Sequence, residues 1–136
     1  MIVQTVTNSF KQDILQGSQD LLTDSIYMAL YVATADLNEN TTAYTTVGEV
    51  TGGNYVAGGV QCQNVTINTS GNTVYVSFDN PTWTNVSFTC RGALIYNLTQ
   101  SNKSIAILNF GSDKTAGPNF VVQLPADTAT SALIRL

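Results

Sequence analysis

Side chains that could carry out chemistry are few in this sequence, and none of its 136 residues is a histidine. The chain therefore lacks the usual general base, the base of a catalytic triad and the commonest metal ligand. Glycoside hydrolysis can proceed without histidine, but it needs two carboxyl groups that face each other across the substrate. The nine candidates are Asp13, Asp20, Asp24, Asp36, Glu39, Glu49, Asp79, Asp113 and Asp127.

Most of these carboxylates fall in segments that we predict to be loops or turns, where acidic side chains commonly bond the local backbone. Asp36 and Glu39 share one loop, and Asp79 could approach Asp113 if their strands are neighbours. The loop Asp36–Asn40 offers oxygens that suit calcium, but it lacks the ligand spacing of an EF-hand. We therefore expect no catalytic residue, no metal and no cofactor.

Cys62 and Cys90 stand too far apart for a redox pair and have no histidine or cysteine neighbours to complete a metal site. Each lies in a strand-like run, so we expect two buried thiols, with a disulfide only if their strands are neighbours. Arg91 is expected either on the solvent face of its strand or paired with a carboxylate at an interface. Trp83 could stack on a sugar, although packing in the core is the more frequent role.

Charged residues make up only 10% of the chain, well under the roughly 25% typical of globular domains. Thr, Asn, Ser and Gln supply the polarity instead, and such residues are easier to bury against a partner than Lys and Glu. Threonine is also a favoured strand residue, so part of this bias belongs to the fold. The five cations are scattered and the net charge is −4, so we expect no nucleic-acid partner.

The length fits one domain, residues 1–136, with an arm and helix over 1–24 and a β-sandwich over 25–136. No segment approaches the ~20 apolar residues that span a bilayer, so we expect no membrane partner. Met1–Thr7 lacks the basic region and hydrophobic run of a signal peptide, so we expect synthesis in the cytosol.

A short helix is predicted near the start of the chain. Asn8-Ser9 offers its N-cap, Gln12 fits a capping box and Gly17 ends the segment. Because two turns are not stable alone, the helix must pack on the domain or on a partner. Met1–Thr7 before it is predicted to be an extended arm. The apolar face of the helix would comprise Phe10, Ile14 and Leu15.

From Ser25 onward the pattern predicts eight or nine short strands and an antiparallel β-sandwich, of which a jelly roll is one form. Ile26–Tyr31 carries bulk on both faces and is predicted to be central. The apolar phase slips within Val60–Ile67, which predicts a bulge near Gln63-Asn64. Ser70-Gly71-Asn72 predicts a hairpin turn. The other expected strands are Ala43–Val50, Val74–Phe78 with its valines facing inward, Trp83–Tyr96 in one phase, Ile105–Phe110, Phe120–Leu124 and Leu133–Leu136, with a loop over Gly111–Gly117.

Six segments, in the order of the chain, carry a family resemblance: SFKQDILQG at 9–17, MALY at 28–31, TTAYTT at 41–46, GEVTGGNYVAGG at 48–59, FTCRGALIYN at 88–97 and NKSIAILNFGSDKT at 102–115. They resemble a family of small virion proteins encoded by tailed bacteriophages and prophages. The likeness covers nearly the whole chain, and the last two segments carry it most strongly. Cys90 departs from the small residue expected at its position.

The resemblance implies a structural protein of the particle, and it suggests a head decoration (cement) protein that binds the outer capsid surface. The expected partners are the major capsid protein and further copies of this chain, with a trimer as the expected oligomer. The expected location is the capsid surface of the virion, after synthesis in the bacterial host cytoplasm. The expected contact residues are Ile2, Val3, Val6, Arg91 and Lys114.

Three alternatives stay open at this point. The chain could be a tail tube, adaptor or fibre-associated component, for which low charge and β-structure fit equally well. It could be a carbohydrate-binding module on the particle surface that uses Trp83 and exposed tyrosines. An enzyme such as a wall hydrolase is the least favoured, because the sequence has no histidine and no convincing acid pair.

Overall fold

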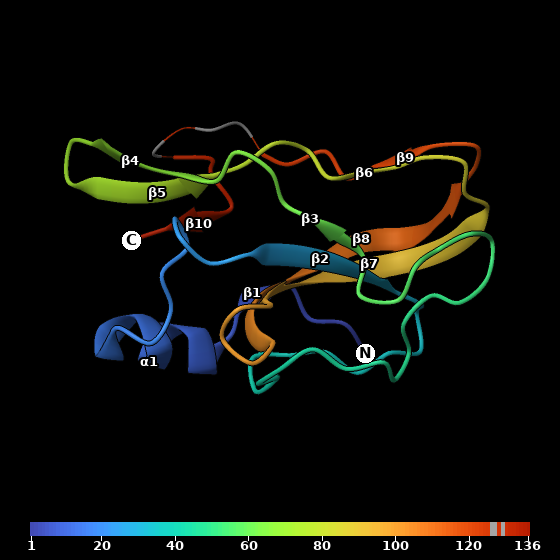
Figure 1. Ribbon diagram of the computed structural model, residues 1–136, viewed down its shortest axis with the longest axis horizontal. Helices are drawn as coiled ribbons and strands as arrows, with labels where there is room; N and C mark the ends of the chain where they lie inside the picture. The colour runs from blue at the N-terminus through green and yellow to red at the C-terminus, as the bar shows by residue number, and fades with distance from the viewer. Residues whose placement is uncertain (126–127, 129) are drawn as a thin grey trace.

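Ten strands and one helix are formed by the residues that the computed structural model describes, which are 1–125, 128 and 130–136 (Figure 1). In every sheet the paired strands run antiparallel. The predicted all-β class with one short helix is therefore confirmed. In chain order the elements are β1 Thr5–Val6, α1 Asn8–Gln16, β2 Ile26–Tyr31, β3 Val60–Gln61, β4 Thr66–Ser70, β5 Thr73–Ser77, β6 Thr82–Trp83, β7 Phe88–Asn97, β8 Lys103–Ala116, β9 Phe120–Val121 and β10 Ile134–Arg135.

The strands form two layers with an apolar core between them (Figure 1). One layer is a five-stranded sheet in the order β1-β8-β7-β2-β3. The other contains the three-stranded sheet β10-β5-β4 and the two-stranded sheet β6-β9. This antiparallel, two-layer arrangement is that of the predicted sandwich. A jelly roll has eight strands in two sheets, whereas the described residues form sheets of five, three and two strands.

Strand β2 lies between β7 and β3 and is buried on both faces, as its sequence predicted. Ile26, Met28 and Leu30 enter the core between the layers. Ala29 and Tyr31 face the other way, where they join a second apolar cluster on the outer side of the sheet. A strand of this kind is central because neither of its faces can be left in water.

The long loop of residues 32–59 covers that outer side. It contains the predicted strand Ala43–Val50, and this prediction is wrong: only Ala43 and Glu49 make isolated bridges to other strands. The apolar side chains of this segment cover a face of the sheet, although its backbone does not pair as a strand. Because they are buried, their pattern in the sequence resembles that of a strand. The loop residues that pack there are Ala35, Leu37 and Tyr44.

The chain passes from one layer to the other between β3 and β4. The phase slip within Val60–Ile67 therefore marks a break between two strands, and the predicted bulge near Gln63-Asn64 is wrong. Asn64 has a φ of 56°, a left-handed conformation that asparagine tolerates better than most residues. The predicted hairpin is confirmed, since Gly71-Asn72 connects β4 to β5.

A β-bulge at Arg91 changes which face of β7 each side chain occupies. Cys90 lies in the core between the layers, whereas Leu94 and Tyr96 lie in the outer cluster. The single phase predicted for Trp83–Tyr96 is therefore wrong, because one extra residue in a bulge reverses the alternation.

Strand β8 is longer than its predicted span of Ile105–Phe110. It continues through Ala116, so most of the expected loop Gly111–Gly117 belongs to the strand. The last two predicted strands are present in shortened form as β9 and β10. Strand β10 completes the small sheet by pairing Ile134 with Val76 of β5.

Helix α1 is confirmed, but its N-cap lies one residue before the predicted position. Thr7 accepts a hydrogen bond from the Phe10 amide at 3.4 Å, and Gly17 ends the helix in the left-handed conformation. Phe10 is buried and Ile14 packs against the core, whereas Leu15, predicted on the same face, is exposed. Within the described parts of the chain, no helix has the length and apolar character needed to cross a membrane.

Candidate functional site

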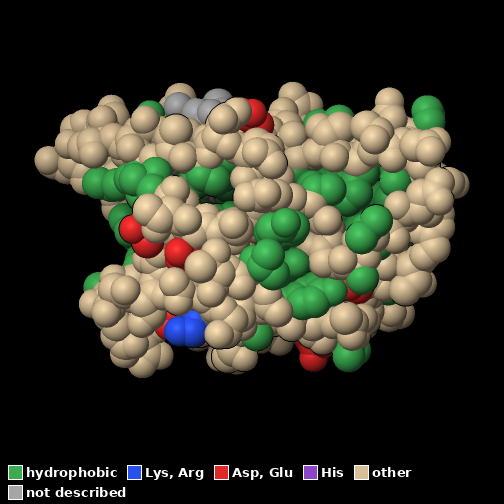
Figure 2. All heavy atoms as spheres, in the orientation of Figure 1, with side chains coloured by type: hydrophobic (Ala, Val, Ile, Leu, Met, Phe, Trp, Pro, Cys, Tyr) green, Lys and Arg blue, Asp and Glu red, His purple; other side chains and the backbone are tan. Residues whose placement is uncertain are grey.

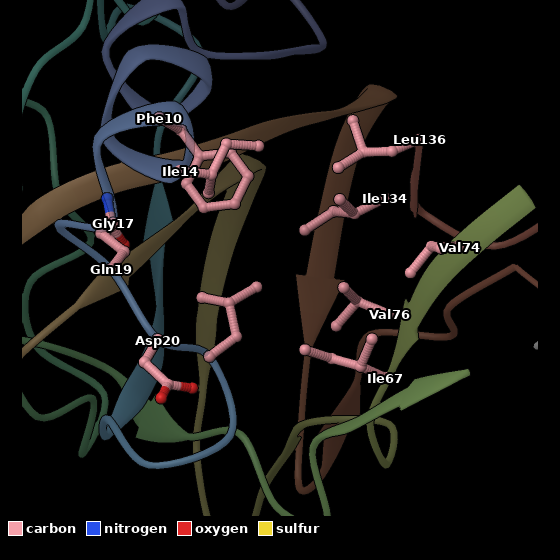
Figure 3. Close-up of a pocket in the computed structure, with 11 residues that line it drawn as sticks. Phe10, Ile14, Gly17, Gln19, Asp20, Ile67, Val74, Val76, Ile134 and Leu136 are labelled. Carbon is pink, nitrogen blue, oxygen red and sulfur yellow. The ribbon is translucent and has the colours of Figure 1, made fainter. Parts of the chain in front are cut away.

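An apolar groove opens between helix α1 and the sheet β10-β5-β4, with a volume of about 330 Å³ (Figure 3). On its sheet side, two rows of side chains cross the strands in register. On its other side, apolar side chains come from α1 and from the turn that follows it. The first row is Ile67, Val76 and Ile134, the second contains Val74 and Leu136, and the opposite side is formed by Phe10, Ile14 and Leu21.

The groove is sealed at its base and open at its mouth. Phe10 and Ile134 are only 2% and 4% exposed. By contrast, Ile67 and Val74 are 43% and 39% exposed, and Leu136 is 71% exposed. Figure 2 shows apolar side chains gathered below β4 and β5, with carboxylates close by. A groove of this kind is a candidate binding surface.

A buried polar network holds the turn of residues 17–24, which forms one side of the groove. The side chain of Gln19 donates to the carbonyl oxygen of Ser104 at 3.3 Å. Asn97 is fully buried, and its amide nitrogen donates to Gln19 Oε1 at 3.1 Å and to Asp24 Oδ2 at 2.8 Å. Because these polar groups satisfy one another, the turn is fixed to strands β7 and β8.

Two carboxylates, Asp20 and Asp24, form an acidic rim beside the groove. Asp20 is the only charged residue among the described groove-lining residues, and its amide donates to Asp24 Oδ2 at 3.0 Å. Burial acts to raise the pKa of Asp24, but hydrogen bonds from Asn97, from the Asp20 amide and from Gln100 outweigh it and lower this pKa. Neither carboxylate joins an ion pair found among the described residues. The lowered pKa keeps Asp24 ionised at neutral pH.

A second cluster surrounds Glu49, a buried carboxylate that is 6% exposed. Its Oε1 accepts from the Tyr44 hydroxyl at 2.6 Å, and its Oε2 accepts from the Tyr55 hydroxyl at 2.7 Å and from the Gly58 amide at 2.8 Å. Since both oxygens bind groups of the loop 32–59, the cluster fastens this loop. Burial, with Glu49 as a further cause, raises the pKa of Tyr31, Tyr44, Tyr55 and Tyr96, the last to about 12.

The N-terminal residues predicted to contact a partner are built into the fold. The extended arm Met1–Thr7 does not stand free, because β1 pairs with β8 and the Val3 amide bonds the Leu37 carbonyl. Ile2 is 4% exposed, so its side chain is buried within the chain and is not presented to a partner. Val6 is half-buried against the core. Val3 is exposed, and its contact with a partner stays a prediction.

The two cationic candidates lie on the β7-β8 hairpin. Arg91 sits at the bulge and pairs with Asp113 of the same chain at 3.6 Å, whereas the pairing expected of it was at an interface. Lys114 lies opposite Cys90 on the neighbouring strand and is exposed. Their contact with a partner also stays a prediction. None of the five candidates lines the groove.

The carboxylates considered for catalysis or calcium engage separate groups. Asp36 lies 3.9 Å from the N-terminal amine, Asp79 accepts from Asn64 at 2.6 Å, and Asp113 belongs to the ion pair just described. In the part of the chain that the structure describes, no three His, Cys, Asp or Glu residues are grouped to hold a metal ion. Asp127 lies outside the described residues.

Cys62 and Cys90 are both free and buried, as expected for structural thiols. Burial raises the pKa of each thiol to about 12, with Asp113 as a further cause at Cys90. Trp83 is also buried, with its ring centroid 5.9 Å from that of Phe120. Its indole face is therefore not available to a sugar, which removes the central residue of the carbohydrate-binding alternative.

The groove is the feature that sequence reasoning misses. Val74 and Val76 are predicted to face inward, and they do, but helix α1 leaves the outer part of their sheet uncovered. The only sequence signal is the brevity of the helix, whose nine residues cannot cover three strands. The chain matches no known family model, no curated protein and no solved structure among those compared.

Proposed function

We propose that this chain is a structural, non-enzymatic protein that binds other proteins, and that it serves as a head decoration protein of a tailed bacteriophage. The observation that carries the binding role is the apolar groove, which is open on one side of a sandwich with few surface charges. Docking there displaces water from apolar side chains and requires little desolvation of charge.

A decoration protein must keep its shape while pressure acts on the shell. The largest sheet supports this role, because both of its faces are buried. The loop 32–59 that covers one face is fastened by Glu49, and the turn beside the groove is fastened by Asn97 and Gln19. Because the turn beside the groove is already fixed, binding there has a lower ordering cost on this chain's side.

The assignment to a phage particle rests on the sequence resemblance. Its two strongest segments, 88–97 and 102–115, form β7 and nearly all of β8, the central hairpin of the large sheet. In the trimer that the resemblance suggests, three copies are linked to one another, so weak contacts at each copy add up to persistent binding. The proposed partners are the major capsid protein and further copies of this chain, with a trimer as the proposed oligomer.

The test is to purify particles of the phage that encodes this chain, to separate heads from tails, and to quantify the chain by mass spectrometry. We expect it on heads, in a fixed ratio to the major capsid protein. Recovery only with tails, in the number of a single ring, would refute the decoration role and support the tail alternative. Absence from both fractions would refute the virion role altogether.

A further inference from the structure

The two edges of the large sheet differ from the outer edge of β4. Strands β1 and β3, at the edges of the large sheet, are only two residues long. Strand β4 has five residues, Thr-Ile-Asn-Thr-Ser, without a charge or a proline, and no strand of the described chain pairs with its outer side. Proteins usually blunt such an edge with short length, lysine or proline, because its free backbone groups can bind another strand.

The first apolar row of the groove ends at this same edge. Ile134, Val76 and Ile67 cross the sheet in register, and Ile67 on β4 is the exposed end of the row. An extended segment that added to β4 would place its next inward side chain beside Ile67. An apolar side chain there would continue the row, as in peptide recognition by strand addition.

Charge decides which occupant fits. Asp20 is labelled at the same end of the groove as Ile67 (Figure 3), and its neighbour Asp24 is also anionic. No Lys or Arg is found among the described lining residues. In a symmetric contact made through this groove, the described lining of a second copy would offer no cation to Asp20. A lysine or arginine of a different protein would be attracted instead.

We propose that β4 and the groove bind an extended segment of another particle protein, in which apolar side chains alternate and a Lys or Arg lies close by. The segment adds to the outer edge of β4, places an apolar residue beside Ile67 and sets its cation near Asp20. This inference rests on the proposed function, because it names the surface through which the chain docks in the particle.

The first experiment compares particles assembled with the wild-type chain and with variants, and it counts copies per particle by mass spectrometry. The groove variant is Ile67→Thr with Val74→Thr, and the matched control is Val121→Thr, a residue 50% exposed on β9. We expect the groove variant to be roughly tenfold less abundant at limiting concentration, because two apolar contacts are lost, and the control to be unchanged. Equal incorporation of the groove variant and the wild type would overturn the inference.

A second variant tests the charge and guards against misfolding of the first. Asp20→Asn removes the charge but keeps a side-chain oxygen. That oxygen can still accept the hydrogen bond that the Leu22 amide donates to Asp20 Oδ1 at 3.1 Å. We expect fewer copies per particle than for the wild type, and a weaker dependence of binding on salt. Unchanged incorporation with unchanged salt dependence would overturn the assignment of a cationic partner segment.

The occupant itself is identified by photocrosslinking in the particle, with Ile67→benzoylphenylalanine. A crosslink to an apolar segment of another particle protein that contains Lys or Arg supports the inference. A crosslink only to a second copy of this chain, or none from incorporated protein, overturns it. If the wild-type chain is missing from particles, the proposed function fails first, and that result is distinct from a groove that makes no difference.

Discussion

Replacing Glu49 by alanine tests whether its buried carboxylate fastens the loop 32–59. The substitution leaves the hydroxyls of Tyr44 and Tyr55 and the Gly58 amide without their common acceptor. Hydrogen bonds to a charged group contribute about 1.5–3 kcal/mol each, and water will partly replace them once the loop loosens. We therefore expect a loss of about 4 kcal/mol in the free energy of unfolding, a large part of the 5–15 kcal/mol typical of a domain.

The assay is urea unfolding followed by the fluorescence of Trp83, the one tryptophan in the sequence, which is buried in the core. Glu39→Ala is the matched control, since Glu39 is exposed in the same loop and should change stability by less than about 0.5 kcal/mol. Glu49→Gln keeps the shape and one acceptor, so it should cost about half as much as alanine. A loss below about 1 kcal/mol for Glu49→Ala, at an unchanged m-value, would refute the role given to this cluster.

Three further predictions follow from the same structure. Because burial raises the pKa of both cysteine thiols to about 12, neither should react with a thiol reagent in the native protein at neutral pH, and both should react in urea. The pKa of Tyr96 rises from 10.0 to about 12, so the native state holds its proton more tightly; the contribution of Tyr96 to stability should be constant below pH 10 and be lost between pH 10 and 12, measured by urea midpoints. Gly59→Ala should cost roughly 3 kcal/mol, because its φ is +79° and a Cβ would lie 1.8 Å from the Met28 carbonyl oxygen, whereas Gly71→Ala, at φ +59° with open space, should cost about 1 kcal/mol.

Strong local patterns in the sequence predict the fold class and several elements. The alternation and bulk of Ile26–Tyr31 identify a central strand, and Ser70-Gly71-Asn72 identifies a hairpin. Gly17 correctly ends the helix, because only a residue that tolerates positive φ closes it well. In each of these cases a few adjacent residues determine the geometry.

The errors arise where a distant part of the chain decides the outcome. The segment Ala43–Val50 has strand-like residues, but its apolar side chains are buried by lying across the large sheet. The bulge at Arg91 is set by the register of β7 against β8, which no local pattern of β7 records. Ile2 looks like part of a free arm because its partner, Leu37, lies far along the chain.

The groove could not be predicted for a related reason, because a buried strand face and an uncovered one have the same sequence. Val74 and Val76 alternate as any inward-facing valines do, and only the placement of α1 leaves Val74 partly in water. No local sequence pattern predicts the acidic rim either, since Asp20 and Ile67 are distant in sequence and lie near each other only across the groove.

The structure also separates the groups that stabilise the fold from those that are available for binding. Glu49 and Tyr44 fasten the loop over the outer cluster of the large sheet, whereas Ile67 and Val74 lie on the other layer and are not among the hydrogen-bond partners found for Glu49. Substitutions in sets that share no partner act on stability nearly independently. A groove variant that unfolds at the wild-type urea concentration yet fails to join particles would therefore report a lost contact, because a loosened fold would first lower the unfolding midpoint.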